Sequence, residues 1–226
     1  MKIKWGAIVV DGSGKLGGHV ASKNRGGTYF KTKVTPVNPQ STFQTVNRAY
    51  FAMLSQGWSS LTAAQIRGWN EAVELFRYTN VFGDLKTLSG KALYQKLNQN
   101  LLITGQSTIS DAPEPQEVPA PIAITAPGVV SPASFSIDTT GDTTGSVLYA
   151  RATPVLSAGT SFIKNRLREI AIETGGSDVS IDIQAAYTAR FEAPAAGDNI
   201  WVAVKAVNAI GQASPEIKAQ AIISAT

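Results

Sequence analysis

The sequence predicts an α+β protein of two domains, in which an extended arm and a small helical bundle precede a β-sandwich. Three observations predict this class. Glycines crowd the first 40 residues, apolar residues then recur every three or four positions, and after a proline-rich stretch the apolar period changes to two. The chain has 226 residues, 43% hydrophobic and 16% charged, which excludes wholesale disorder. We expect an arm at 1–40, a three-helix domain at 41–109, a linker at 110–121 and the sandwich at 122–226.

The arm holds seven of the twenty glycines. Its strand-like stretches are 2–5, 7–10 and 28–34, and glycines supply turns and close backbone approaches between them. A segment of this composition buries little of itself. We therefore expect the arm to gain order by lying along a neighbouring surface, or by pairing with the sheet edge of another protein.

The net charge of +4 hides an asymmetry along the chain. Residues 1–35 carry seven Lys and Arg against Asp11 alone, a net charge of +6. Residues 36–110 carry +3 and residues 111–226 carry −5. A basic arm on an acidic body indicates that the two ends face different partners, although lysines that merely solubilise the arm would give the same pattern.

Three helices are predicted in the middle segment. Ser41 opens the first, which Gly57 is expected to end; Thr62 and Gln65 form a capping box for the second. Ser89 caps the third, which Gly105 closes. The apolar stripes of the three helices are Phe43, Val46, Tyr50, Met53 and Leu54; Ile66, Trp69, Val73 and Phe76; and Leu93, Leu97 and Leu101. Trp58 and Trp69 are interpreted as core residues of a small bundle rather than as ligand-stacking residues.

A linker with four prolines in nine residues follows, and its composition favours stiff, extended polyproline geometry. Beyond it, alternation at 134–138, 179–183 and 200–207 predicts strands, with turn signals between them. On the last strand we expect Ile200, Val202, Val204 and Ala206 on one face. About seven short strands in such a length are typical of a β-sandwich. Residues 160–172 fit a strand, a loop or a short helix.

The sequence contains few of the residue types and motifs that enzyme active sites use. The chain has no cysteine and a single histidine, His19. Gly12, Gly14 and Gly17 match a dinucleotide-binding fingerprint, but no helix pattern follows and no acidic residue lies about 20 positions on. The carboxylate pairs Asp138 with Asp142 and Asp178 with Asp182 lie at expected turns, where solvation explains them. We expect no catalytic, cofactor-binding or metal-binding residues, no cofactor and no enzymatic activity. No apolar run approaches 18 residues, and no signal peptide or membrane partner is expected.

Six residues of the arm are candidates for docking on a partner. They combine cations with aromatic rings: Lys23, Arg25, Tyr29, Phe30, Lys31 and Lys33. The same mixture neutralises phosphates and stacks on bases in nucleic-acid-binding proteins. The charge density is modest and the Arg-Gly-Gly at 25–27 occurs once, so nucleic acid is not the partner we favour.

The C-terminal stretch 191–214 resembles the region from the fifth to the seventh strand of fibronectin type III and related immunoglobulin-like domains. A Pro-Gly loop precedes a long alternating strand, which Asn208, Gly211 and Ser214 close in the family's pattern. The sequence departs from the pattern at Ile200, where the family usually has its corner tyrosine. The resemblance implies an immunoglobulin-like β-sandwich.

Most of the chain also resembles a group of small phage and prophage proteins. The resemblance rests on the Gly-rich start, GGTYFK at 26–31, TPVNPQ at 35–40, LTAAQIRGWNEA at 61–72 and ATPVLSAG at 152–159. Such proteins are similar to virion components of tailed phages of the crAss-like kind. The resemblance implies a structural role, as an auxiliary capsid protein made in the host cytoplasm and incorporated in the virion.

The function expected from these observations is that of a non-enzymatic virion protein. Its N-terminal half would dock on the major capsid protein, other virion proteins or further copies of itself as a homo-oligomer, and its sandwich would project. Two alternatives stay open: an adhesion or glycan-binding module that uses the sandwich loops, and a nucleic-acid-associated head or connector protein.

Overall fold

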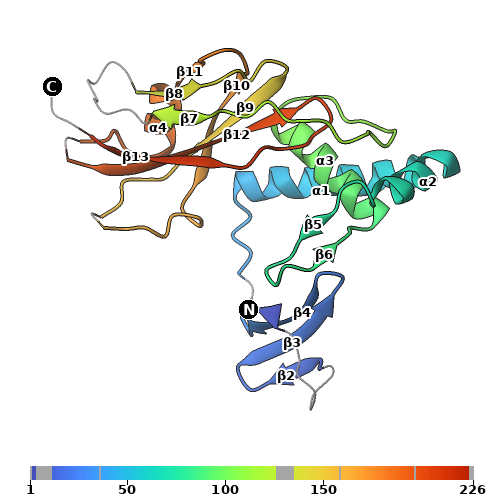
Figure 1. The fold of residues 1–226 in the computed structure, drawn as a ribbon. Helices are drawn as coiled ribbons and strands as arrows, with labels where there is room; N and C mark the ends of the chain where they lie inside the picture. The colour runs from blue at the N-terminus through green and yellow to red at the C-terminus, as the bar shows by residue number, and fades with distance from the viewer. Residues whose placement is uncertain are drawn as a thin grey trace. The chain divides into compact units, whose positions relative to one another are not determined.

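The structure is a computed structural model in which helices and antiparallel sheets are mixed (Figure 1), so the α+β class is confirmed. The residues that it describes are 2–3, 12–35, 37–125, 135–157, 159–195 and 197–223. Contacts divide the chain into two compact units. The N-terminal unit comprises 1–96 and 110–115, and the C-terminal unit comprises 97–109 and 116–226.

The first residues of the N-terminal unit form a small antiparallel sheet in the order β1-β4-β3-β2. Its strands are β1 (Lys2–Ile3), β2 (Gly14–Leu16), β3 (His19–Asn24) and β4 (Gly27–Thr32). Two-residue turns join the last three strands, with Leu16 paired to His19 and Asn24 paired to Gly27. The strand expected at 28–34 is therefore present, whereas most of 2–10 lies outside the described residues.

An extended arm is therefore not what residues 12–35 form. Gly17 takes φ +56°, in the left-handed region that a tight hairpin turn needs, and the side chain of Asn24 accepts a hydrogen bond from the Gly26 amide at the next turn (2.9 Å). These turns let the segment pair its backbone with itself. The glycines were expected to supply turns between strand-like stretches, and Gly17 and Gly26 do so within two hairpins.

Helix α1 (Thr42–Ser60) runs three residues past the expected end at Gly57. Gly57 lies where the helix meets Tyr94, and a Cβ placed on it would lie 2.9 Å from the Tyr94 hydroxyl. The glycine therefore permits close packing rather than ending the helix. Of the predicted stripe, only Leu54 is buried.

Helix α2 (Ala63–Ala72) begins with the predicted capping box, in which the Gln65 amide donates to Thr62 Oγ1 (3.3 Å) and the Thr62 amide donates to Gln65 Oε1 (3.0 Å). Trp69 is fully buried, as expected, and its indole N–H donates to the Ser110 carbonyl (2.8 Å). A two-stranded hairpin that the sequence did not indicate follows, with β5 (Tyr78–Thr79) and β6 (Leu85–Lys86).

Helix α3 (Gly90–Ile103) has the Ser89 side chain at its start, which accepts from the Ala92 amide (3.3 Å). Gly105, with φ +72°, follows its end as expected. The boundary between the two units falls within this helix, after Lys96. Within the C-terminal unit, Asn100 Nδ2 donates to the Gly211 carbonyl (2.8 Å). The second half of α3 is thereby fixed to the turn that follows the longest strand.

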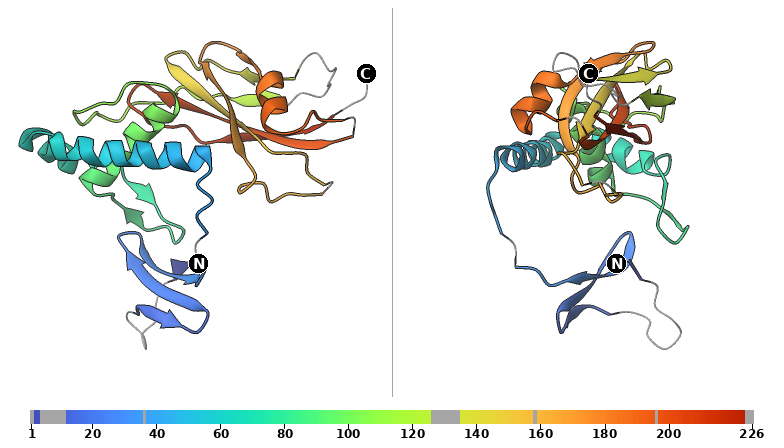
Figure 2. Two further views of the ribbon diagram at one scale, coloured as in Figure 1. Left: turned by 180° about the vertical axis from the view of Figure 1, so that it is seen from behind. Right: turned by 90° about the vertical axis from the view of Figure 1, so that its left-hand side faces the viewer.

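The C-terminal unit is a sandwich of two antiparallel sheets that face each other (Figure 2). One sheet has the order β11-β8-β7 and the other the order β10-β9-β12-β13. Their bounds are β7 Ala123–Thr125, β8 Ser136–Thr140, β9 Ser146–Ala152, β10 Arg168–Thr174, β11 Ser180–Asp182, β12 Asn199–Asn208 and β13 Ile217–Ile222. The predicted inward face of β12 is fully buried at Ile200, Val202, Val204 and Ala206.

Two further features complete the sandwich. Helix α4 (Gln184–Arg190), which the sequence did not predict, buries Tyr187 edge-on against Phe135, with ring centroids 5.0 Å apart. The ambiguous segment 160–172 divides into a loop and the start of β10. Leu156, Ile163 and Leu167 from the connection before β10 pack on Ala203, outside the main core. No described helix is both long and apolar enough to cross a membrane.

Candidate docking surface

The candidate docking surface is the N-terminal sheet, defined here as residues 12–35, because all six predicted docking residues lie in it. Side chains alternate between the two faces of a strand, and directly paired residues of antiparallel strands share a face. The register pairs Ala21 with Phe30, and Ser22 with Tyr29. Tyr29 and Phe30 therefore lie on opposite faces.

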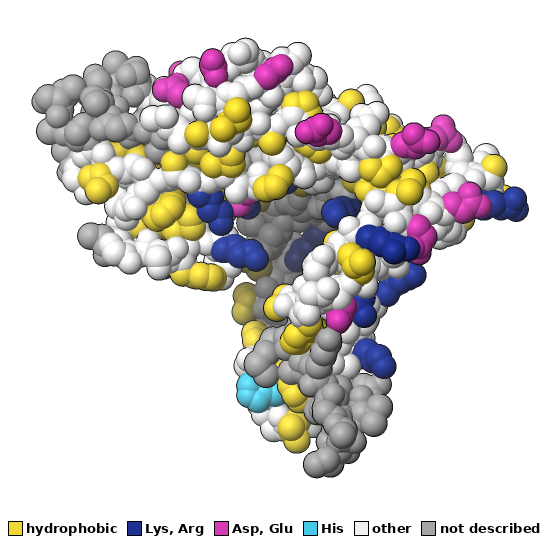
Figure 3. All heavy atoms as spheres, viewed as in Figure 1, with side chains coloured by type: hydrophobic (Ala, Val, Ile, Leu, Met, Phe, Trp, Pro, Cys, Tyr) yellow, Lys and Arg dark blue, Asp and Glu magenta, His cyan; other side chains and the backbone are white. Residues whose placement is uncertain are grey.

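One face of the N-terminal sheet is largely apolar. Leu16 is 68% exposed and lies beside His19 through the β2–β3 turn. Together with Phe30 and Thr32, these residues line a hollow of about 380 Å³, to which Lys31 also contributes. Figure 3 shows apolar side chains around the single histidine on this sheet. A hollow bordered by leucine and phenylalanine can receive an apolar side chain of a partner.

The opposite face is cationic. Lys15 pairs with Val20, and Val20 pairs with Lys31, so two lysines flank a valine across three strands. Tyr29 lies on the same face beside Ser22. Both lysines are exposed. This face suits an acidic or phosphate-bearing surface, and it differs in chemistry from the apolar face behind it.

The structure brings the six predicted residues onto one small sheet but not onto one face. Tyr29 and Lys31 share the cationic face, whereas Phe30 and Lys23 lie on the apolar side. Arg25 is in the turn before β4, and the Lys33 amide donates to the Gly18 carbonyl just beyond the strand (2.8 Å). The docking role itself stays a prediction. Sequence reasoning missed Lys15, Leu16 and His19 as docking residues. The two glycines Gly17 and Gly18 could have indicated the hairpin that pairs Lys15 and Leu16 with β3 and places His19 beside β4.

The features that suggested other chemistry have local structural roles. In the described chain, no group of three or more His, Asp or Glu residues could hold a metal ion. Gly17 is followed by strand β3, so no helix N-terminus stands where a dinucleotide phosphate would bind. Each of these carboxylates accepts a hydrogen bond: Asp138 from Ser180, Asp142 from Thr144, Asp178 from Gly141 and Asp182 from Gln184. Asp138 lies within β8, opposite Ser180 of β11, and not at the expected turn. The hydrogen bonds from Thr144 lower the pKa of Asp142.

In the sandwich, the outer face of the sheet β10-β9-β12-β13 carries a network of paired polar groups. Tyr149 Oη donates to Glu169 (3.1 Å), Arg151 pairs with Glu216, and Lys205 Nζ lies 5.1 Å from the centroid of the Tyr149 ring. Burial, with Glu169 beside it, raises the pKa of Tyr149, and burial lowers the pKa of Lys205. Most of these polar groups therefore already have a partner within the sheet, although Arg151 Nε is buried without a hydrogen-bond partner among the described residues.

Comparisons with known proteins add little to this geometry. No protein-family model matches the chain, and none of the curated proteins matches it. Among solved structures, an Fn3-like protein from Clostridium thermocellum is 16% identical, with a TM-score of 0.28. That match covers 48% of this chain and 94% of the other.

The strand order itself describes the C-terminal unit. The first, second and fifth sandwich strands form one sheet, and the remaining four form the other with β9 and β12 at the centre. This is the arrangement of an immunoglobulin-like sandwich. Tyr187 of α4 donates from its hydroxyl to the Thr153 carbonyl (3.0 Å), which joins α4 to the residue that follows β9. Burial raises the pKa of Tyr187.

Proposed function

We propose that this chain is a non-enzymatic structural protein of a tailed-phage virion, an auxiliary or decoration protein. Its N-terminal half, with the glycine-rich N-terminal sheet as its docking element, attaches to the capsid. The immunoglobulin-like sandwich forms a second domain and projects outward. The observation that carries the proposal is the unequal distribution of exposed apolar side chains between the two compact units.

Sixteen large apolar residues of the described chain are exposed, and eleven of them belong to the N-terminal unit. The N-terminal unit has thirteen Lys and Arg against six Asp and Glu, a net charge of +7, and the C-terminal unit has seven against ten, a net charge of −3. Exposed apolar surface in such amounts marks interaction sites in soluble proteins. The basic, apolar unit is therefore the one suited to a partner, and the acidic unit is suited to solvent.

The N-terminal sheet offers two ways of attachment. Its hollow beside Leu16 and Phe30 receives an apolar side chain of the shell protein, while Lys15 and Lys31 on the other face meet acidic groups. Strand β2 is an edge strand of three residues, to which a segment of the shell protein can be added. Strand addition and side-chain insertion together give a specific contact over a small area.

The first test is whether the protein belongs to particles at all. Virions purified on a density gradient are analysed by mass spectrometry, and the proposal requires this chain at a fixed stoichiometry to the shell protein. If the chain stays in the soluble fraction of the lysate, the proposal is wrong. Binding to a glycan array, or steeply salt-dependent binding to DNA without particle association, would favour the alternative functions.

The second test concerns the surface. Leu16→Ser should weaken the binding of purified full-length protein to particles that lack it by about tenfold or more. Ile222→Ser is the matched control, because Ile222 lies on the sandwich and is 64% exposed against 68% for Leu16. Equal binding by the two variants would show that the N-terminal sheet is not the docking element.

A further inference from the structure

The first half of α1, residues 42–53, carries an apolar stripe that faces solvent. Phe43, Val46, Tyr50 and Met53 are spaced three, four and three residues apart, so they lie along one side of the helix. Val46 is 42% exposed and Met53 is 46% exposed. None of the residues 42–53 is buried. Four of the five residues in the stripe that the sequence assigned to a bundle core are therefore not buried.

The second half of the same helix differs. Leu54 is buried, the Trp58 ring lies 5.5 Å from that of Tyr94, and Lys91 Nζ donates to Ser55 Oγ (3.2 Å). The second half therefore packs against α3, whereas the first half contains no buried residue. Isolated helical segments of about twelve residues are marginally stable in water, even with favourable sequences. The first half of α1 gains stability if its apolar stripe packs on another surface.

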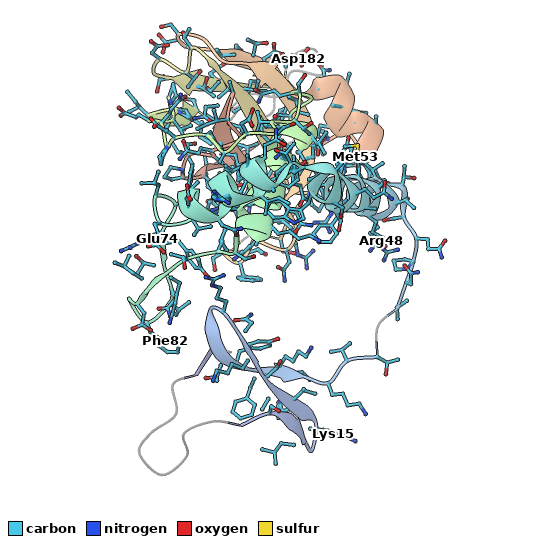
Figure 4. All side chains as sticks on the ribbon, turned by 90° about the vertical axis from the view of Figure 1, so that its right-hand side faces the viewer. Lys15, Arg48, Met53, Glu74, Phe82 and Asp182 are labelled. Carbon is cyan, nitrogen blue, oxygen red and sulfur yellow. The ribbon has the colours of Figure 1, made fainter. Side chains whose placement is uncertain are left out.

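The spacing and the charges of the stripe indicate what that surface is. Alternating intervals of three and four are the a and d positions of a heptad, which pack against another helix with the same repeat. Arg48 is the single charged residue between 41 and 60, and Figure 4 shows it on the opposite side of α1 from Met53. Two copies of this helix can therefore approach along the stripe without repulsion between like charges. Uncharged Asn47 and small Ala49 flank the seam.

We propose that residues 42–53 of α1 pair with the same segment of a second copy of this chain, through a seam of Val46, Tyr50 and Met53, with Phe43 at its end. The pairing goes beyond the proposed attachment to a shell and does not depend on it. A seam of two heptads is small compared with the ~800 Å² per partner of stable complexes. The dimer is therefore weak in dilute solution and is strengthened wherever copies are held close together.

Cysteine cross-linking tests the seam directly, because the chain has no cysteine of its own. Single variants of the full-length protein, Val46→Cys and Met53→Cys, are compared with Arg48→Cys at high concentration under mild oxidation. Disulfides form quickly only where two Cα atoms come within about 7 Å. We expect rapid dimer formation at position 46, 53 or both, and slow formation at 48. Rapid disulfide formation at both position 46 and position 53 indicates that the two helices are parallel. Rapid formation at only one of these positions indicates that the helices are antiparallel and cross near that residue. Equal rates at all three positions would overturn the proposal.

Sedimentation equilibrium gives an independent measure. Met53→Ser should weaken the self-association of the full-length chain by about tenfold. Phe51→Ser is the matched control on the same helix, because Phe51 is 53% exposed and lies outside the heptad positions. Its association should stay within about twofold of the unaltered chain. A chain that remains monomeric at every concentration, or equal weakening by both variants, would show that α1 does not pair with itself.

Discussion

The two units of this chain use apolar side chains in opposite ways. In the described C-terminal unit, 22 hydrophobic residues are buried and five large ones are exposed. In the described N-terminal unit, six are buried and eleven large ones are exposed. Most of the buried apolar residues of the C-terminal unit lie between the two sheets of the sandwich, whereas the N-terminal unit buries few, Trp69 and Leu93 completely among them.

This difference indicates what each unit can do alone. Burial of apolar surface is the main favourable contribution to folding, so the sandwich has what it needs to be independently stable. The N-terminal unit has a smaller contribution of this kind. Its sheet is joined by short hairpin turns, and the first half of α1 has no buried residue and no side-chain capping hydrogen bond from Ser41. A difference in stability between the units is therefore the physical counterpart of the proposed division between attachment and projection.

Truncation of a leucine in each unit should give the largest contrast. Leu148 of β9 is fully buried in the sandwich core, and Leu148→Ala should lower the free energy of unfolding by about 2–5 kcal/mol. Leu16→Ala removes the same atoms from an exposed position and should change it by less than about 0.5 kcal/mol. Chemical denaturation of both variants measures the difference. Similar losses would mean that the N-terminal sheet is more tightly packed than its exposure indicates.

A pair of glycines tests where the boundary between the units lies. Gly211 and Gly145 both take φ +80°, so alanine at either costs about 1–2 kcal/mol of backbone strain. At Gly211 a Cβ would also lie 2.2 Å from the Leu97 carbonyl oxygen, whereas at Gly145 nothing lies within 4 Å. Gly211→Ala should therefore cost about 3 kcal/mol in total, more than Gly145→Ala.

Hydrogen exchange shows which segment responds to the glycine change. If the second half of α3 belongs to the sandwich unit, the amides of 97–103 lose protection in Gly211→Ala and keep it in Gly145→Ala. An unchanged exchange pattern along α3 in both variants would place that half of the helix with the N-terminal unit instead.

Sequence patterns predicted the elements whose local signals and packing agree. The capping box at Thr62, the serine before α3 and the inward face of β12 all appear as expected, because hydrogen bonds and alternation are encoded within a few residues. Trp69 was also assigned to the core correctly. Such elements can be predicted without knowing which distant parts of the chain they contact.

The candidate site was predicted less well, for reasons that lie in long-range contacts. The stripe of α1 has the periodicity of a core helix, yet only Leu54 meets a neighbour that buries it. Periodicity reports which side chains share a face, and says nothing of what covers that face. The docking residues were chosen by composition, and the pairing of β3 with β4 places them on two faces. Helix α4 was not predicted, because the burial of Tyr187 in the sandwich core stabilises this helix and no local sequence pattern announces it.

The buried hydroxyl of Tyr187 gives a pH-dependent comparison of the units. Tyr187→Phe leaves the Thr153 carbonyl without this donor and should cost about 1–2 kcal/mol at pH 8. Burial raises the pKa of Tyr187 in the folded chain, so the unfolded chain loses the proton first. The stability contributed by Tyr187 is present below pH ~10 and is lost as the pH rises, at up to about 1.4 kcal/mol per pH unit.

The free energy of unfolding, measured by chemical denaturation between pH 8 and 11, therefore tests whether the Tyr187 hydroxyl is buried. The unaltered chain should lose stability more steeply above pH ~10 than Tyr187→Phe does. Tyr50→Phe on α1 is the control, since Tyr50 is only half-buried, and it should follow the unaltered chain. Parallel curves for the unaltered chain and Tyr187→Phe would contradict the burial of this hydroxyl.

The smallest predicted effect lies in the N-terminal unit, at the capping box of α2. Thr62→Ala removes the oxygen that accepts from the Gln65 amide and should cost about 1 kcal/mol, whereas Thr62→Ser keeps the oxygen and should cost less. Because the unit has few buried apolar residues, this loss should appear as faster hydrogen exchange at the start of α2 and across its neighbours, with the sandwich unchanged. If exchange in the sandwich rises equally in Thr62→Ala, the two units unfold together, and the contrast in packing does not translate into separate stabilities.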